Sequence, residues 1–277
     1  MSVTRTDFEY VRTLIHQCAG IVLEEGKEYL VESRLSPLAE KEGFDSLGEY
    51  LGRLQLDAFN GSHRKMIHAM TTNETLFFRD RRPFELLRTR VIPDLLAARA
   101  TERRLTFWSA ACSTGQEPYT IAMTLQEYFP QLHGWNIRII ASDLSSDVLA
   151  RAIQGRYTQL EVNRGLPARF LVKYFTRVGD DWQIREEIRR MIEFREMNLT
   201  EAWSFLPKID VIFMRNVLIY FNQETKRKVL SKIAPLLPAS GYLFLGSAET
   251  TLNIAEEFEP IPGVVAACYR LKRPKLL

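Results

Sequence analysis

From Leu105 onward, continuous apolar runs alternate with amphipathic runs of helical length, and this alternation is the feature that most narrows the possible folds. The apolar runs read as buried strands: "LTFWSA", "NIRIIASD", "IDVIFMRN", "GYLFLGS" and "VVAACYRL". The runs between them read as helices: "EPYTIAMTLQEYF", "SSDVLARAI" and "QETKRKVLSKIAPLL". Continuous apolar strands separated by helices are typical of a doubly wound, mostly parallel sheet in an α/β protein.

One stretch interrupts the alternation. The run "FTRVGDDWQI", residues 175–184, reads as two short strands around the turn Gly179-Asp180-Asp181. It predicts a small antiparallel β insertion within the α/β domain, which we expect over about residues 170–196.

The first 70 residues show helical periodicity only. Phe8, Val11, Leu14 and Ile15 are spaced for one face of a helix. Further short helices are expected over residues 29–41, 46–56 and 64–70. The chain is therefore expected to divide into three parts: a small all-helical domain over 1–70, a linker over 71–85 and the α/β domain over 86–277.

Composition excludes several classes of protein. The chain has 277 residues, of which 46% are hydrophobic and 26% charged, and no apolar run approaches the roughly 20 residues that cross a bilayer. Its net charge of +3 is too small to indicate nucleic-acid binding. Cys18, Cys112 and Cys268 form no C-x-x-C pair, so reduced thiols in a cytoplasmic protein are expected, with no metal site.

The stretch "FWSAACSTGQEPYTIAM", Phe107 to Met123, begins as a strand and ends as a helix, an arrangement that usually binds a nucleotide-like cofactor. A dinucleotide loop needs several glycines, and only Gly115 is present. Glu117 would oppose a pyrophosphate, but it suits a cofactor with an amino group and no phosphate, such as S-adenosylmethionine. The alternative is an ordinary glutamate at a helix N-terminus, where the macrodipole favours it.

A second acid supports the same cofactor. Asp143 ends the run "NIRIIASD", at a position where an acid typically accepts hydrogen bonds from ribose hydroxyls. Alternatively Asp143 caps the following helix, although Ser145 can supply that cap. The single-glycine loop and this acid together predict a class I S-adenosylmethionine-dependent methyltransferase.

Three further runs make the prediction more specific: "TTNETLFFRD" (71–80), "MNL" (197–199) and "FMRNVLIYF" (213–221). With the cofactor loop, they resemble the CheR family of chemotaxis-receptor methyltransferases over nearly the whole chain. The resemblance implies methyl transfer from S-adenosylmethionine to glutamate side chains on the cytoplasmic helical bundle of a chemoreceptor. It also implies that the linker contributes to the cofactor site.

The resemblance assigns roles to individual residues. The implied cofactor contacts are Asn73, Thr75 and Arg79 from the linker, Glu117 on the amino group, Asp143 on the ribose, Asn198 and Leu199 beside the adenine, and Arg215 and Asn216 near the methionine part. Arg79 and Tyr220 are the catalytic candidates, because the family's matching positions stand closest to the methyl group. From the residues alone, an Asn-Thr pair such as Asn73 and Thr75 is more often a turn than a ligand.

The expected chemistry needs no general base. A glutamate with a reference pKa of about 4.3 is already a carboxylate at neutral pH. This agrees with the absence of a recognisable Ser-His-Asp or Cys-His arrangement, and with four histidines that lie outside every motif. Arg79 and Tyr220 are therefore expected to orient the reacting groups. A monomer is the default oligomeric state, and a regulatory protein is a further possible partner.

Two departures from the family pattern affect these expectations. Members that bind a receptor C-terminal pentapeptide have a longer, glycine-bearing loop in the β insertion, whereas this chain has only "VGDDW". We therefore expect direct recognition of the receptor bundle without such a tether. Many members also read G-H-S-E after the late strand, and here the run is Gly246-Ser247-Ala248-Glu249, without the histidine.

Two other functions compete with this one. A methyltransferase acting on nucleic acid or a small molecule would share the fold, but adenine-directed enzymes usually carry an Asn/Asp-Pro-Pro-aromatic run where this chain has "RNVLIY". A non-catalytic protein that senses the cofactor would also share the fold. Loss of Arg79, Asp143 or Tyr220 would favour the sensor, and all three are present.

Overall fold

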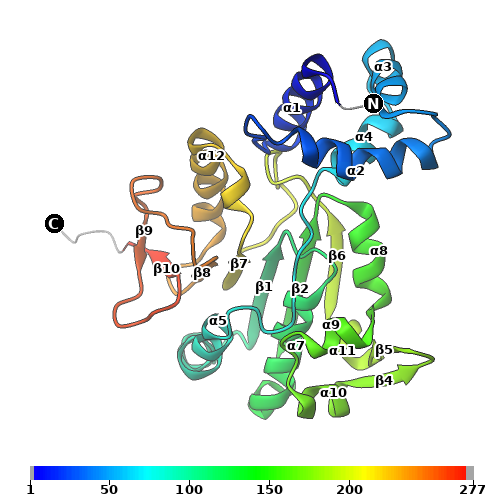
Figure 1. Cartoon of the computed structure of the whole chain (residues 1–277). Helices are drawn as coiled ribbons and strands as arrows, with labels where there is room; N and C mark the ends of the chain where they lie inside the picture. Colours follow the sequence, from blue (N-terminus) through cyan, green and yellow to red (C-terminus); the bar gives the residue numbers. More distant parts are fainter. Residues whose placement is uncertain (1–2, 273–277) are drawn as a thin grey trace. The chain divides into compact units, whose positions relative to one another are not determined.

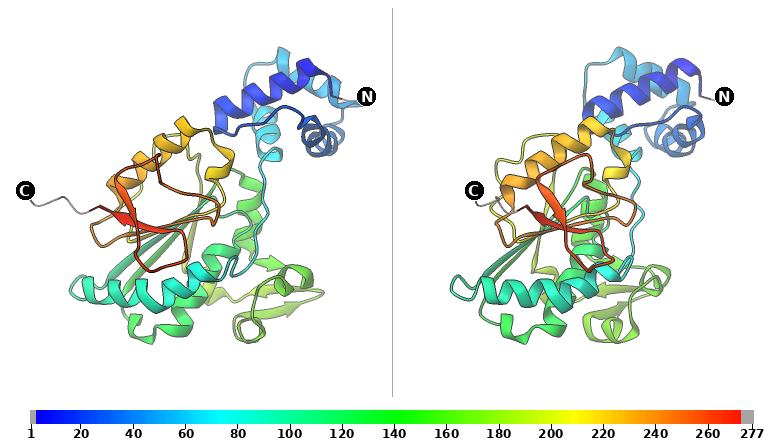
Figure 2. Two further views of the ribbon diagram at one scale, coloured as in Figure 1. Left: turned by 60° about the vertical axis from the view of Figure 1, so that its left-hand side comes forward. Right: turned by 90° about the vertical axis from the view of Figure 1, so that its left-hand side faces the viewer.

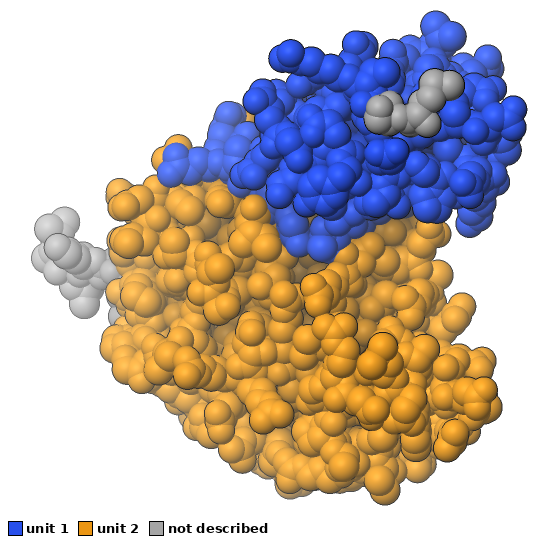
Figure 3. Space-filling view, in the orientation of Figure 1, with its two compact units in different colours: residues 1–72, 220–225 blue, residues 73–219, 226–277 orange. Residues whose placement is uncertain are grey.

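The computed structural model describes residues 3–272 and divides the chain into two compact units (Figure 3). The first unit comprises the chain up to Thr72 together with Tyr220–Thr225, and the second comprises Asn73–Ile219 and the chain from Lys226 onward. Within residues 3–272, no helix is long and apolar enough to span a membrane.

The first unit is all-helical (Figure 1). Its helices are α1 (Arg5–Ala19), α2 (Glu28–Lys41), α3 (Leu47–Leu56) and α4 (Gly61–Ala69). Side-chain caps start three of them: Thr4, Ser46 and Asn60 each accept a hydrogen bond from a backbone N–H in the first turn of the following helix. The predicted apolar face of α1 is buried in the unit's core, where Phe8, Val11 and Ile15 are at most 2% exposed.

The short segment Tyr220–Thr225 packs with this helical unit although it is distant in sequence. The N–H of Val22 donates to the carbonyl of Tyr220 over 2.8 Å, and Ile21 forms an antiparallel bridge with Phe221. The side chains of His16 and Asn222 are hydrogen-bonded over 3.0 Å. The run "FMRNVLIYF" is thus split between the units, since its first seven residues belong to the second unit.

The second unit is built on a seven-stranded sheet of order β6-β2-β1-β7-β8-β10-β9. The strands are β1 (Arg104–Ala110), β2 (Asn136–Asp143), β6 (Ile192–Glu196), β7 (Val211–Met214), β8 (Tyr242–Leu245), β9 (Phe258–Pro260) and β10 (Cys268–Leu271). The first five strands of that order are parallel, and β10 and β9 add antiparallel pairs at one edge. β1, β7 and β8 are almost wholly buried, which explains their continuous apolar sequences.

Helices cover both faces of this sheet, as the alternating pattern predicts. They include α5 (Arg82–Leu86), the π-helical turn η1 (Leu87–Val91), α6 (Ile92–Ala98), α7 (Gln116–Tyr128), α8 (Ser146–Gln154) and α12 (Gln223–Ile233). Figure 2 shows α12 and the continuous segment α5-η1-α6 on opposite faces of the sheet. The predicted doubly wound, mostly parallel α/β fold is confirmed.

The predicted antiparallel insertion is also confirmed, as a separate three-stranded sheet of order β3-β5-β4. β4 (Phe175–Val178) and β5 (Asp181–Ile184) are the two expected strands, and β3 (Arg156–Tyr157) adds a third that is too short to recognise from sequence. β6, which the sequence pattern grouped with this insertion, instead pairs with β2 in the large sheet. Its edge position leaves most of its residues partly exposed, so it lacks the continuous apolar run of the central strands.

Candidate active site

Five parallel strands end at the same edge of the large sheet, and each one leads into a segment with a polar side chain of interest. In sheet order, β6 is followed by Asn198, β2 ends in Asp143, β1 leads to Glu117, β7 is followed by Arg215 and β8 by Glu249. The carboxyl edge of such a sheet is where open α/β proteins bind ligands. The candidate site is therefore built on this edge, within the second unit.

The loop after β1 depends on its single glycine. Gly115 has φ +93°, and a Cβ added there would stand 3.0 Å from Ala152 Cβ and 3.2 Å from the Tyr157 hydroxyl. Ala111 and Ser113 also have positive φ, at 56° and 51°. The loop thus adopts a sharply turned backbone with one glycine where a phosphate-binding loop would have several.

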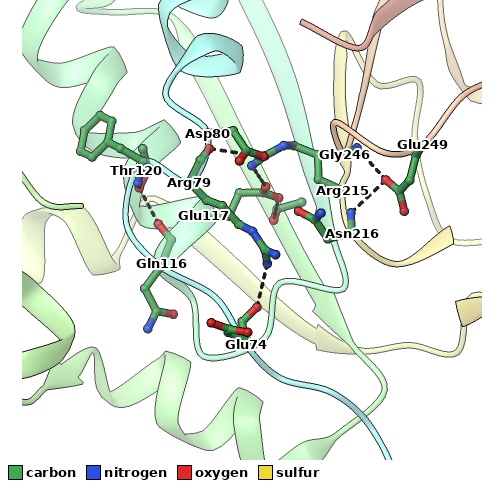
Figure 4. A network of polar contacts seen from close by, with 12 residues as sticks. Glu74, Arg79, Asp80, Gln116, Glu117, Thr120, Arg215, Asn216, Gly246 and Glu249 are labelled. Atoms are coloured by element: carbon green, nitrogen blue, oxygen red, sulfur yellow. Dashed lines mark hydrogen bonds and ion pairs between the residues drawn. The ribbon is translucent and has the colours of Figure 1, made fainter. Parts of the chain in front are cut away.

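Glu117 lies in the first turn of α7, and its carboxylate contacts two neighbouring elements (Figure 4). Its Oε1 accepts from Ser109 Oγ over 2.8 Å, and its Oε2 accepts from Arg215 Nη1 over 2.9 Å. The side chain is only 13% exposed. A glutamate favoured only by the helix macrodipole would not need these partners, so Glu117 belongs to a polar site.

Arg215 connects three segments of the chain. Besides Glu117, its guanidinium donates to Asp80 Oδ2 over 2.6 Å and to the carbonyl of Arg79 over 3.0 Å. The side chain is 2% exposed, its guanidinium carbon lies 5.6 Å from the centre of the Phe84 ring, and its buried Nε has no hydrogen-bond partner within residues 3–272. Arg215 is therefore a buried cation beside two carboxylates.

Asp143 accepts hydrogen bonds from the backbone of two loops. Its Oδ2 accepts from the N–H of Ser113 over 2.8 Å, and its Oδ1 accepts from the N–H of Ser145 over 3.0 Å. The expectation that Ser145 supplies the cap of α8 is wrong, because its side chain makes no capping hydrogen bond. Asp143 instead accepts the backbone N–H of the N-cap residue Ser145 itself.

Both acids affect the pKa of the Cys112 thiol. Burial raises the pKa of this thiol well above its ordinary value, and the neighbouring carboxylates of Asp143 and Glu117 raise it further. The raised pKa keeps Cys112 neutral at physiological pH, so it adds no third negative charge to the loop.

The segment Asn73–Asp80 is fastened to the second unit by several contacts. Ser113 Oγ donates to the carbonyl of Asn73 over 2.7 Å, and the N–H of Phe78 donates to Thr120 Oγ1 over 3.2 Å. A Cβ added at Gly165 would stand 2.1 Å from the Phe77 carbonyl oxygen, so the backbone approaches very closely there. The contact between Ser113 and Asn73 places the segment beside the β1 loop.

The predicted residues of this segment differ in their surroundings. Arg79 Nη1 donates to the carbonyl of Glu74 over 2.9 Å, so its guanidinium is turned back onto its own segment (Figure 4). Asn73 contributes its backbone carbonyl to the Ser113 contact. Thr75 is partly buried.

The segment after β6 is a compact turn. Asn198 Oδ1 accepts from both the N–H and the hydroxyl of Thr200, over 3.0 and 2.8 Å. Leu199 is buried, and its carbonyl accepts from Lys232 Nζ over 2.7 Å. Burial lowers the pKa of Lys232. The Asn198 side chain thus stabilises a turn, while Leu199 presents an apolar surface.

The structure brings together Glu117, Asp143, Arg215 and the segment that carries Asn73 and Arg79, all within the second unit. Asn216 follows Arg215 with φ +58° and donates its N–H to Glu249. Tyr220 is assigned to the first unit by its contacts, so its hydroxyl is not placed relative to these residues.

Sequence reasoning missed Ser109, Ser113, Asp80 and Glu249. Asp80 is the last residue of the run "TTNETLFFRD", so the motif includes it, but its contact with Arg215 cannot be predicted from the sequence. The serines carry no recognisable signal, because small polar residues are common in loops after strands.

Backbone conformation gives an independent indication of the site. Eight described non-glycine residues have positive φ. Six of them lie in the segment before α5, the β1 loop or the turn after β7: Phe78, Asp80, Arg81, Ala111, Ser113 and Asn216. Strained backbone clusters at functional sites, and here three segments distant in sequence share it.

Comparisons with known proteins agree with this location. The family model "CheR methyltransferase, SAM binding domain" matches residues 73–266, and "CheR methyltransferase, all-alpha domain" matches residues 6–71. The chain is 42% identical over 280 residues to chemotaxis protein methyltransferase 1 of Pseudomonas aeruginosa, with 98% of this chain and 100% of that protein covered. It is 40% identical over 272 residues to chemotaxis protein methyltransferase Cher2 of Pseudomonas putida, with coverages of 96% and 98%.

The β1 loop yields a test of its geometry. Replacing Gly115 with Ala adds left-handed strain and brings a Cβ close to Ala152, Tyr119 and Tyr157, so we expect the free energy of unfolding to fall by more than about 2 kcal/mol. The matched control is Gly179→Ala, because Gly179 also has positive φ (63°) but its nearest neighbour would be 4.0 Å away. Denaturant unfolding measures both variants. Equal losses would show that packing around Gly115 is not a constraint.

Proposed function

The chain belongs to the CheR methyltransferase family, and from this membership we propose that it transfers methyl groups from S-adenosylmethionine to glutamate side chains of chemoreceptors. The products would be glutamyl methyl esters in the receptors' cytoplasmic helical bundles, formed for sensory adaptation. The observation that carries the proposal is the pair of carboxylates, the partly buried Glu117 and the buried Asp143, at the edge of a sheet whose only loop glycine after β1 is Gly115.

The donor and acceptor set fits S-adenosylmethionine. This cofactor has an amino group, a ribose and a sulfonium but no phosphate, so it needs carboxylate acceptors and no nest of glycine N–H groups. Glu117 and Asp143 supply such acceptors at the carboxyl edge of the sheet.

We assign the cofactor-binding roles as the resemblance implies. Glu117 would bind the amino group, Asp143 the ribose, Asn198 and Leu199 the adenine, and Asn73, Thr75, Arg79, Arg215 and Asn216 the remainder. The Asn198 side chain already closes a turn with Thr200, which favours contact with the adenine through the turn's shape. In this assignment, residues 1–70 form the helical domain, 71–85 the contributing linker and 86–277 the methyltransferase domain.

The protein's own contribution to the reaction is positioning. When bound, S-adenosylmethionine supplies a methyl group on a positively charged sulfur. Arg79 and Tyr220 orient the receptor carboxylate, and Arg79 has guanidinium donors beyond the one used on the Glu74 carbonyl. No side chain has to remove a proton, because the receptor glutamate is ionised at neutral pH. Positioning of this kind contributes up to about 7–11 kcal/mol.

Recognition of the receptor follows from the same family membership. We propose a cytoplasmic enzyme, monomeric by default, that binds the receptor bundle directly and has no nucleic-acid partner. A regulatory protein is a possible further partner. The hairpin between β4 and β5 turns over Gly179 and Asp180 alone. Enzymes tethered to a C-terminal pentapeptide are expected to have a longer loop at this place, so the short turn supports recognition without a tether.

Labelling of receptors tests the proposed function. Incubation with membranes that contain candidate chemoreceptors and with methyl-labelled S-adenosylmethionine should give base-labile label on receptor glutamates, located by mass spectrometry. Asp143→Asn should reduce the label by about tenfold or more, because it removes a buried acceptor. The matched control Asp147→Asn, an exposed residue of α8, should leave it unchanged. Base-stable label, or label on nucleic acid, would contradict the proposal.

A second arm of this experiment tests direct recognition. Receptors that lack their last five residues should be methylated at the same rate as intact ones. The order β3-β5-β4 leaves β4 at a sheet edge, where an added peptide strand could pair, so the comparison is informative. Loss of methylation on truncation would show that a tether is used.

Tyr220→Phe tests the catalytic assignment. We expect kcat to fall by about tenfold or more, since one orienting hydroxyl is lost, while cofactor affinity changes little. Tyr29→Phe is the matched control, because Tyr29 is a 58% exposed tyrosine of the helical unit. Steady-state kinetics and calorimetry with S-adenosylhomocysteine separate the two effects. An unchanged kcat would remove Tyr220 from the mechanism.

A further inference from the structure

Glu249 is a buried carboxylate that the assigned roles leave unused. It follows β8, in the run Gly246-Ser247-Ala248-Glu249, and is 7% exposed. Burial of a charged group is costly unless hydrogen bonds replace its water. A specific structural task is therefore expected of Glu249.

The Glu249 carboxylate accepts three backbone N–H groups from two loops. Oε2 accepts from Asn216 over 2.9 Å and from Gly246 over 2.6 Å, and Oε1 accepts from Ile219 over 3.2 Å. Figure 4 shows the Asn216 and Gly246 contacts beside Arg215. Hydrogen bonds to an ionised acceptor are about twice as strong as neutral ones. Glu249 thus binds both ends of the turn 216–219 after β7.

The turn begins with a left-handed residue. Asn216 has φ +58°, a conformation that asparagine tolerates better than most residues. It reverses the chain directly after Arg215, the residue that contacts Glu117 and Asp80. A fixed turn therefore determines the position of Arg215 and of the residues that follow the turn.

The loop that carries Glu249 is shaped for this contact. A Cβ added at Gly246 would stand 2.7 Å from Glu249 Oε2 and 2.9 Å from both the backbone and side-chain nitrogens of Asn216. Gly246 is therefore required for close approach of the two loops. Its own N–H is one of the three donors to the carboxylate.

We propose that Glu249 is a positioning residue for methyl transfer, acting through the turn 216–219. By holding the N–H groups of Asn216 and Ile219, it fixes Arg215 and Asn216 at one end of the turn and the backbone entering Tyr220 at the other. The inference deepens the proposed function and rests on it for the role of Tyr220. The backbone anchoring itself is independent of that role.

Glu249→Gln tests the proposal with two separate readouts. A glutamine has one acceptor oxygen, so at least one of the three N–H groups loses its partner. Hydrogen exchange in the ligand-free chain should become about tenfold or more faster at the amides that lose their acceptor, which are Ile219 or both Asn216 and Gly246, with little change in strands β7 and β8. In the labelling reaction, kcat should fall by about tenfold, with the receptor KM unchanged. Glu256→Gln, an exposed glutamate seven residues later, is the matched control and should change neither readout.

Gly246→Ala provides a second variant that keeps the charge. Its Cβ displaces the carboxylate or Asn216, so it should speed exchange at Asn216 and Ile219 and lower kcat in the same way. Unchanged exchange at the three amides, or equal acceleration throughout β7 and β8, would overturn the anchoring. Faster exchange at those amides with full kcat would overturn the positioning role. Base-stable product from the wild type would instead contradict the proposed function alone.

Discussion

The buried guanidinium of Arg215 is the interaction on which the site depends. It donates to Glu117 from the start of α7 and to Asp80 from the segment before α5, and it is itself carried by the turn after β7. These segments are 98 and 135 residues from Arg215 in sequence. A buried arginine is tolerated only with well-placed acceptors, and loss of one partner of a buried pair typically costs about 3–5 kcal/mol. Asp80 is partly exposed, so its share is smaller.

The other parts of the site converge on this centre. The parallel sheet brings the ends of β1, β2, β6, β7 and β8 to one edge, and the left-handed residues Ala111, Ser113 and Asn216 turn the chain sharply there. Carboxylates accept hydrogen bonds from backbone N–H groups of these turns. Asp143 accepts from the β1 loop, and Glu249 accepts from the turn after β7. Carboxylates therefore act as structural acceptors as well as prospective ligand contacts. Such a rigid, anionic edge suits a cationic cofactor without phosphate.

The sequence predicts the architecture well because buried parallel strands have continuous apolar runs, as in β1, β7 and β8. It does not predict β6, whose edge position leaves a mixed pattern, or the two-residue β3. Motif resemblance selects Glu117, Asp143 and Arg215, which the fold brings to one edge. It misses Asp80 and Glu249 because their importance lies in contacts with residues far along the chain. Tyr220 belongs to the first unit and Arg215 to the second, and this assignment likewise depends on tertiary contacts.

The site requires Arg215 to hold the segment carrying Asp80 against the cofactor loop. Calorimetric titration of S-adenosylhomocysteine into Asp80→Asn tests it most directly, since asparagine tolerates the left-handed backbone at this position (φ 66°) and removes only the charge. We expect an affinity about five- to tenfold weaker than that of the wild type and of Glu85→Gln, an exposed control in α5. An affinity equal to the wild type would contradict it.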